Sequence, residues 1–342
     1  DAYSWHKIFD VNVPVGVLAV LLAAFVQKEW KNQTRSPFDW QGFAAIVLFM
    51  PLAIYALARG NSPSNPGGWS APEVIGCFIV AGAALAWFIV AELRNPAPLL
   101  QIRLLAERNF GISMAVLTLF AIGMLGGTYL LPLYMQRGLG YTALAAGSMF
   151  LPVGVIQGVL SAVSGYLTRY VRPLLLSAAG ILIMALSFWL ASRFTLHTTH
   201  GHILFILYLR GFGMGLTFAP LNLFSLKNLT QQDMAAAAGI SNSIKQLAGS
   251  IGIALLTVIF SARTSYHAAH ETVSAAQTYV EGVTDALRVV AVITLAALLP
   301  LLGVFRKKRP GKSGVKGAAT PSPGEAVSGK TDKTTIYRTK PE

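Results

Sequence analysis

Long stretches without a charged side chain limit what this sequence can fold into. They cover residues 11–27, 40–58, 74–91, 109–136, 138–168, 173–192, 211–226, 246–262 and 289–305. A helix that crosses the hydrocarbon core of a bilayer needs about 20 mostly apolar residues, which matches these stretches once they are extended to their flanking turn residues. The sequence therefore predicts an all-α polytopic membrane protein. Its nine transmembrane helices are expected at about 8–27, 40–58, 72–92, 110–136, 141–167, 174–192, 203–225, 236–261 and 285–305.

The composition excludes an ordinary soluble enzyme. Of the 342 residues, 12% are charged and 54% are hydrophobic, whereas a soluble domain carries about 25% charged residues. Such a chain has too few polar groups to cover a surface in water. The single cysteine, Cys77, also excludes a disulfide scaffold and the usual thiolate metal sites.

Lys and Arg residues predict the orientation in the membrane. The loops after the first, third, fifth and seventh helices carry nine of them, and the opposite loops carry five. The tail after residue 305 adds ten more to the side of the nine. Because basic loops stay in the cytoplasm, we expect the tail to be cytoplasmic, next to an anionic leaflet.

Three sequence patterns suggest chemistry that their context does not support. Residues 324–331 match a phosphate-loop pattern, but they lie in a low-complexity tail without the strand and helix that such a loop needs. The basic tail also lacks the aromatic residues that would favour nucleic-acid binding. His197, His200 and His202, with His267 and His270 in a second expected outside loop, have no Cys or carboxylate nearby in the sequence, so we predict no metal site.

Charged side chains inside the spans are the more informative polar residues, because burying a charge in lipid is costly. Arg210 lies in the seventh expected helix and Lys245 in the eighth. One interpretation is that both line a polar substrate cavity, and the other is that each binds a backbone carbonyl or reaches the membrane interface. In the first interpretation the cavity would also contain Gln136, Gln157, Asn222, Asn242 and Gln246.

Carboxylates are expected only near the helix ends. Asp10, Glu73 and Asp285 lie near predicted helix starts, and Glu92 ends the third helix. Proton-coupled transporters normally use a carboxylate buried in the membrane, and Asp10 is the nearest candidate here, against an interfacial role. No His with Asp or Glu forms a catalytic constellation, so we predict that the chain is not an enzyme.

Six segments together resemble a known family. They are IFDVNVPVG at 8–16, LPLYMQ at 131–136, GSMFLPVG at 147–154, GYLTRYVRP at 165–173, RGFGMGLTFAPL at 210–221 and NSIKQLAGSIG at 242–252. Their order and spacing resemble the EmrB/QacA-type drug:proton antiporter branch of the major facilitator superfamily. Lys245 stands where Arg is usual in that branch and Ala248 where Gly is usual.

The resemblance implies a domain organisation, because such transporters have fourteen helices in two six-helix halves with an inserted pair between them. On that pattern, residues 1–27 hold the last helix of the first half and 28–109 the inserted pair with an amphipathic interfacial linker. Residues 110–305 form the complete second half, and 306–342 a basic, disordered cytoplasmic tail. We expect the chain to be the C-terminal portion of a longer protein, without the family's first five helices and the acid in the first of them.

The resemblance also implies a function. Such a protein is a secondary active transporter of the bacterial inner membrane that exports hydrophobic or amphipathic drugs, often cationic, in exchange for protons by alternating access around a site near the bilayer midplane. It needs no cofactor, and in Gram-negative bacteria some members join a periplasmic adaptor and an outer-membrane channel. Two alternatives stay open: a transport-inactive membrane scaffold or sensor, and an importer of a small polar solute on the same fold.

Overall fold

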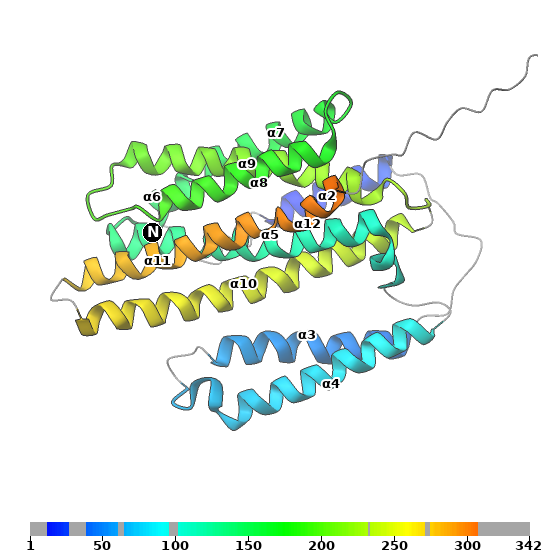
Figure 1. The fold of residues 1–342 in the computed structure, drawn as a ribbon, viewed down its shortest axis with the longest axis horizontal. Helices are drawn as coiled ribbons and strands as arrows, with labels where there is room; N and C mark the ends of the chain where they lie inside the picture. The colour runs from blue at the N-terminus through cyan, green and yellow to red at the C-terminus, as the bar shows by residue number, and fades with distance from the viewer. Residues whose placement is uncertain are drawn as a thin grey trace, which may run out of the picture.

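Helices make up the fold of the computed structural model, which describes residues 12–26, 39–60, 65–95, 102–231, 233–270 and 274–306. The helices are α2 (Asn12–Val26), α3 (Trp40–Gly60), α4 (Pro72–Arg94), α5 (Arg108–Leu133), α6 (Ala143–Ser148), α7 (Leu151–Leu167), α8 (Pro173–Ala191), α9 (His200–Leu226), α10 (Met234–His270), α11 (Ala275–Ala296) and α12 (Leu299–Arg306) (Figure 1). Short helical turns lie at η1 (Gly68–Ser70), η2 (Ile102–Ala106) and η3 (Tyr134–Gly138). No strand occurs in these ranges.

The predicted all-helical membrane fold is confirmed. Eight helical segments within the described ranges are long and apolar enough to cross a membrane. They match eight of the nine expected spans, and α2, with its shorter apolar run Gly16–Phe25, lies within the remaining one. Residues 8–11 and 27 of that expected span lie outside the described part of the chain.

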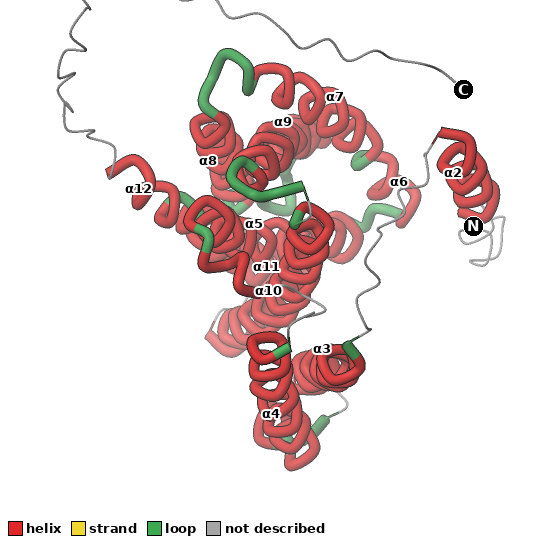
Figure 2. The backbone as a smooth tube through the Cα atoms, turned by 90° about the vertical axis from the view of Figure 1, so that its right-hand side faces the viewer, coloured by secondary structure: helices red, strands yellow, loops and turns green. Residues whose placement is uncertain are grey.

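The helices from α5 to α12 pack around one hydrophobic core. Helix α9 packs against α7 and α8, and α11 packs against α5, α8 and α10. The largest fully buried side chains of this bundle include Phe110, Phe120, Tyr134 and Phe188. Helices α3 and α4 pack on each other beside the bundle and touch it through α10 (Figure 2). The domain boundaries given above remain a prediction.

Two predicted boundaries are wrong at the end of the bundle away from α12. The spans expected at 236–261 and 285–305 belong to longer helices, because α10 continues to His270 and α11 begins at Ala275. The segment 262–284 between them was expected to be a long polar segment on the outside, with room for a helical turn or two, and it contains no proline. The Ser274 side chain caps α11 by accepting a hydrogen bond from the Gln277 amide at 3.2 Å. Charge thus marks where the apolar surface ends, not where the helix ends.

Two other spans are interrupted. Residues 149–150 separate α6 from α7, and residues 297–298 separate α11 from α12. A proline follows each interruption, Pro152 in the first turn of α7 and Pro300 in that of α12. Because proline lacks the amide N–H and clashes with the preceding turn, it favours a new helix start over a continuous helix. Of the expected interfacial linker, 96–101 lies outside the described residues and Ile102–Ala106 forms the turn η2.

Close packing of α5 against α10 requires glycine at the crossing. A Cβ atom added to Gly252 would lie 2.8 Å from the Ile122 Cα and 2.9 Å from the Ile122 carbonyl carbon. Both are backbone atoms, so they cannot rotate away. Gly126 of α5 faces the same crossing, since a Cβ atom added to it would lie 3.1 Å from the Gly252 carbonyl oxygen. Small residues at such crossings let helix backbones approach closely in lipid.

We expect the substitution Gly252→Ala to destabilise the chain by about 1–3 kcal/mol, because the new methyl group must push α5 and α10 apart. The measurement is the Tm of the purified protein in detergent. Gly82→Ala in α4 is the matched control, since nothing lies within 4 Å of a Cβ at Gly82. That control should be neutral or slightly stabilising, because alanine is the better helix former. Equal Tm values for the two variants would show that the crossing tolerates a side chain.

Candidate functional site

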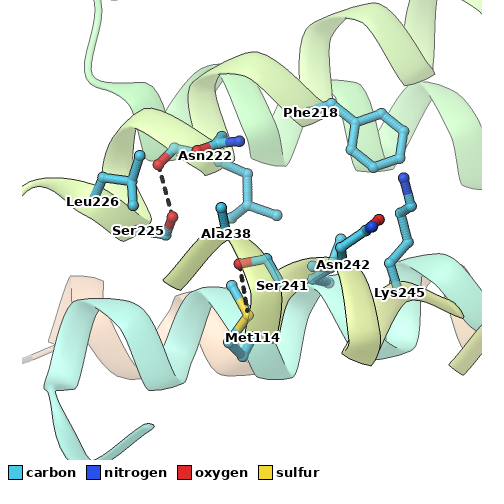
Figure 3. A pocket seen from close by; sticks show the side chains of 11 residues that line it. Met114, Phe218, Asn222, Ser225, Leu226, Ala238, Ser241, Asn242 and Lys245 are labelled. Carbon is cyan, nitrogen blue, oxygen red and sulfur yellow. Dashed lines mark hydrogen bonds between the residues drawn. The ribbon is translucent and has the colours of Figure 1, made fainter. Parts of the chain in front are cut away.

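A cavity of about 390 Å³ lies between α5, α9 and α10 (Figure 3). Its lining combines apolar side chains from all three helices with polar side chains from α9 and α10. The lining residues are Met114, Leu117, Phe218, Leu221, Asn222, Ser225, Leu226, Ala238, Ser241, Asn242 and Lys245. Three of the seven residues predicted for a substrate cavity, Asn222, Asn242 and Lys245, are therefore brought together.

Helical spacing explains why these residues share a face. Asn242 and Lys245 are three residues apart on α10, and Phe218 and Asn222 are four apart on α9. Residues at these spacings lie one above the other on the same side of a helix. Figure 3 shows the Lys245 side chain extending from α10 toward the Phe218 ring of α9, with Asn242 beside it.

The polar groups of the cavity fall into two kinds. The hydroxyl groups have partners: Ser225 donates to the Asn222 carbonyl at 2.7 Å and Ser241 to the Ala237 carbonyl at 2.7 Å. The Ser241 hydroxyl also lies 3.4 Å from the Met114 sulfur of α5. The side-chain amides of Asn222 and Asn242 and the Lys245 ammonium make no hydrogen bond or ion pair with another described residue. Lys245 Nζ lies 6.0 Å from the centroid of the Phe218 ring. These three groups are therefore available to a ligand.

Arg210 lies elsewhere, buried between α9, α5 and α8. One terminal nitrogen donates to the Met124 carbonyl at 3.3 Å and to the Thr128 hydroxyl. The guanidinium carbon lies 5.5 Å from the centroid of the Phe188 ring, and the other terminal nitrogen is buried without a hydrogen-bond partner in the structure. This geometry agrees with the second interpretation of Arg210, in which it binds a backbone carbonyl and joins helices.

The predicted glutamines do not line this cavity. Gln136 lies in the turn η3 and is exposed, Gln157 is half-buried on α7, and Gln246 is exposed on α10 beside Lys245. Asp10, the weak candidate for proton coupling, lies outside the described residues. The use of these four residues in transport remains a prediction.

An ion cluster between α10 and α11 was missed in the sequence. Asp285, expected near a helix start, lies in the middle of α11 with a side chain that is only 10% exposed. Its carboxylate accepts hydrogen bonds from Arg263 Nε at 2.6 Å and from an Arg288 terminal nitrogen at 2.8 Å. The ring nitrogen Nε2 of His267, expected in a loop, lies 3.0 Å from the same carboxylate.

The spacing of this cluster could have revealed it. Arg263 and His267 are four residues apart, as are Glu281 and Asp285, so each pair lies on one face only if the segment is helical. His267 Nδ1 lies 3.5 Å from Glu281 Oε2, which completes the link between the two helices. Within the described ranges, no group of three or more His, Cys, Asp or Glu side chains is arranged to hold a metal ion.

We expect Arg210→Met to lower the free energy of unfolding by about 1–3 kcal/mol, because the Met124 carbonyl and the Thr128 hydroxyl lose a charged donor. The free energy of unfolding is measured by denaturant titration in mixed micelles. The loss should be smaller in a Thr128→Val background, where one acceptor is already absent. An equal loss in both backgrounds would show that the contact between Arg210 and Thr128 contributes nothing.

The substitution Asp285→Asn should destabilise the link between α10 and α11 by about 2 kcal/mol, because it removes the charge that three donors share. Glu73→Gln is the matched control: Glu73 pairs with Arg59 at 2.8 Å, but its side chain is 46% exposed, and exposed pairs contribute little. Hydrogen exchange of residues 263–288 locates the effect. Unchanged protection in Asp285→Asn would argue against a stabilising role of the cluster.

Comparison with known proteins identifies the family. The model of the Major Facilitator Superfamily matches residues 1–253. The multidrug export protein EmrB of Escherichia coli (strain K12) is 32% identical over 276 residues, which cover 80% of this chain and 53% of the relative. The uncharacterized MFS-type transporter YhcA of Bacillus subtilis (strain 168) is 29% identical over 78% of the chain and 49% of its own length. The fatty acid resistance protein FarB of Neisseria gonorrhoeae is 28% identical over 78% of the chain and 52% of its own length.

The chain thus spans about half the length of the curated relatives that it matches. The family match covers well over half of the chain and agrees with the all-helical fold and its membrane-spanning helices. It also agrees with the resemblance carried by the six sequence segments. This chain belongs to the major facilitator superfamily.

Proposed function

We propose that this chain is part of a secondary active transporter that exports hydrophobic or amphipathic drugs in exchange for protons. Family membership and the relatives named for multidrug export and fatty acid resistance support this function. In alternating access, two halves of a transporter rock around a ligand site that opens to one side of the membrane at a time. The bundle from α5 to α12 would be one of these halves.

The observation that carries the proposal is the cavity between α5, α9 and α10. Its volume of about 390 Å³ falls within the range of about 300–1,000 Å³ that is typical of small-molecule sites. Met114, Leu117 and Leu221 offer an apolar surface, while Asn242 and Lys245 offer polar groups without partners in the described structure. An apolar wall with a few available polar groups suits an amphipathic compound.

The remaining parts of the proposal concern the coupling ion and the partners. None of the residues that line the cavity is a carboxylate, so we expect the coupling proton to bind elsewhere, at Asp10 or in a part of the transporter beyond this chain. Family membership favours the bacterial inner membrane, and the basic loops favour a tail in the cytoplasm. A periplasmic adaptor and an outer-membrane channel are proposed as partners for the case of a Gram-negative host.

The test is drug resistance conferred by the full-length protein in a bacterial strain that lacks its major efflux pumps. We expect Asn242→Leu and Lys245→Met to lower the minimal inhibitory concentration of transported drugs at least fourfold at an unchanged amount of protein in the membrane. Lys227→Gln is the control, since Lys227 is exposed at the end of α9 and does not line the cavity. Full resistance in both cavity variants would favour a scaffold or sensor.

Direction and coupling are measured in inside-out vesicles. An exporter should accumulate drug in the vesicles when a proton gradient is imposed and release it when the gradient is collapsed. Uptake of a polar solute in the opposite direction would instead favour the importer alternative.

A further inference from the structure

We propose that His267 is a proton-binding site, and that the bound proton fastens α10 to α11. The proposal goes beyond the function proposed above, because this proton is not the coupling proton and the site lies apart from the cavity. The pattern that carries it is an imidazole ring whose two nitrogens each face a carboxylate of the neighbouring helix.

The ring of His267 lies between two acids of α11. Its Nε2 lies 3.0 Å from the Asp285 carboxylate and its Nδ1 lies 3.5 Å from Glu281 Oε2. A neutral imidazole has a proton on one nitrogen only, so it can donate to one carboxylate while its other nitrogen turns a lone pair toward the second. An imidazolium donates from both nitrogens. The added proton therefore converts a repulsive contact into an attractive one.

Glu281 indicates which nitrogen gains the proton. Its Oε1 accepts a hydrogen bond from Gln277 Nε2 at 3.1 Å. Its Oε2 is buried and receives no hydrogen bond in the structure. A buried carboxylate oxygen without a donor is costly. Because Nε2 of His267 is at hydrogen-bond distance from Asp285, the added proton belongs on Nδ1, where it can satisfy Glu281.

Two arginines belong to the same cluster, and their charges oppose a further cation. Arg263 and Arg288 both bind Asp285, and within the described ranges neither forms an ion pair with Glu281. Their side chains are 47% and 56% exposed, so water screens their repulsion of an imidazolium. The His267 side chain is only 13% exposed. The attraction of two nearby carboxylates is thus screened less than the repulsion.

Other charged or titratable groups belong to the elements around α10. Arg59 of α3 pairs with Glu73 of α4 at 2.8 Å. His270 is exposed, and its Nδ1 lies 2.9 Å from the Tyr266 carbonyl oxygen. Further groups on α5, η3, α10 and α11 are Tyr129, Arg137, Tyr266 and Tyr279. Between pH 6 and pH 8 tyrosine stays neutral and arginine stays charged, so the two histidines are the groups whose charge changes.

The position of the site decides which solution it samples. His267 follows Lys245 by 22 residues on α10, which is about 33 Å along a helix axis. It therefore lies at the end of the bundle where α10 ends and α11 begins (Figure 1), and the expected orientation places this end outside. Acid in the outer medium would complete the link between the helices. The link weakens as the pH rises through the range in which the imidazolium loses its proton.

Hydrogen exchange of the full-length protein in nanodiscs, without drug, tests the proposal. Exchange of residues 263–288 is measured at pH 6 and pH 8, on either side of the usual titration range of imidazole, and is corrected for the intrinsic effect of pH on exchange. We expect protection about tenfold higher at pH 6, a factor that one charge-assisted hydrogen bond supplies. Equal protection at the two pH values would overturn the proposal.

Variants assign the pH dependence to His267. His267→Gln should remove it, because glutamine gains no proton in this range, and Glu281→Gln should reduce it, because the second carboxylate is absent. His270→Gln is the matched control and should keep the full difference. A tenfold difference that survives in His267→Gln would show that another group carries the proton.

A further variant keeps the proposal testable if His267→Gln does not fold. His267→Lys has a positive charge at both pH values, so its protection should be equal at pH 6 and pH 8, and a persistent difference would contradict the proposal. Because no drug is present, none of these outcomes bears on export, and a failed resistance test would leave the proton site standing.

Discussion

The structure depends on one constraint: within the hydrocarbon core, each backbone amide and carbonyl group must find its partner inside the protein. Continuous helices satisfy this requirement locally, and the helical segments that could span the membrane account for most of the described chain. The same constraint explains the serine and threonine hydroxyls, which donate to carbonyls of their own helices, as Ser241 does to Ala237 and Thr217 to Gly213. Groups left without such partners, including the Asn242 amide and the Lys245 ammonium, therefore stand out as candidates for function.

The spans could be predicted because a helix that crosses lipid must have a minimum length and an apolar surface, and both can be read from the amino-acid sequence. The sequence could not predict where α10 ends and α11 begins, because a charged residue such as Arg263 ends the apolar surface without breaking the helix. This is also why the environment of Asp285 was missed: two of its partners, Arg263 and His267, come from a part of α10 that was expected to be a loop. The need to pair backbone groups thus determines where a helix must be continuous within the membrane, but it does not determine where that helix ends at the membrane surface.

The candidate site was predictable only in part, for a similar reason. Asn242 and Lys245 share a helix face by their spacing, and Asn222 joins them because α9 packs near α10 and α5. Arg210 carries the same kind of sequence signal, a charge in an apolar span, yet it meets the Met124 carbonyl and Thr128. Which residues a buried charge meets depends on helix rotation and packing, and these are set by contacts such as that of Gly252 with Ile122, which join distant parts of the chain.

The ion cluster of α10 and α11 also indicates the depth of the cavity in the membrane. Arg263 and Arg288 directly precede or follow the uncharged runs of their helices and are about half exposed, so they mark one boundary of the hydrocarbon core. Lys245 lies 18 residues before Arg263 on α10, which is about 27 Å along a helix axis, compared with a core about 30 Å thick. The cavity therefore lies close to the opposite boundary, on the side where α10 begins and α12 ends, and not at the midplane that the family resemblance implies for a substrate site.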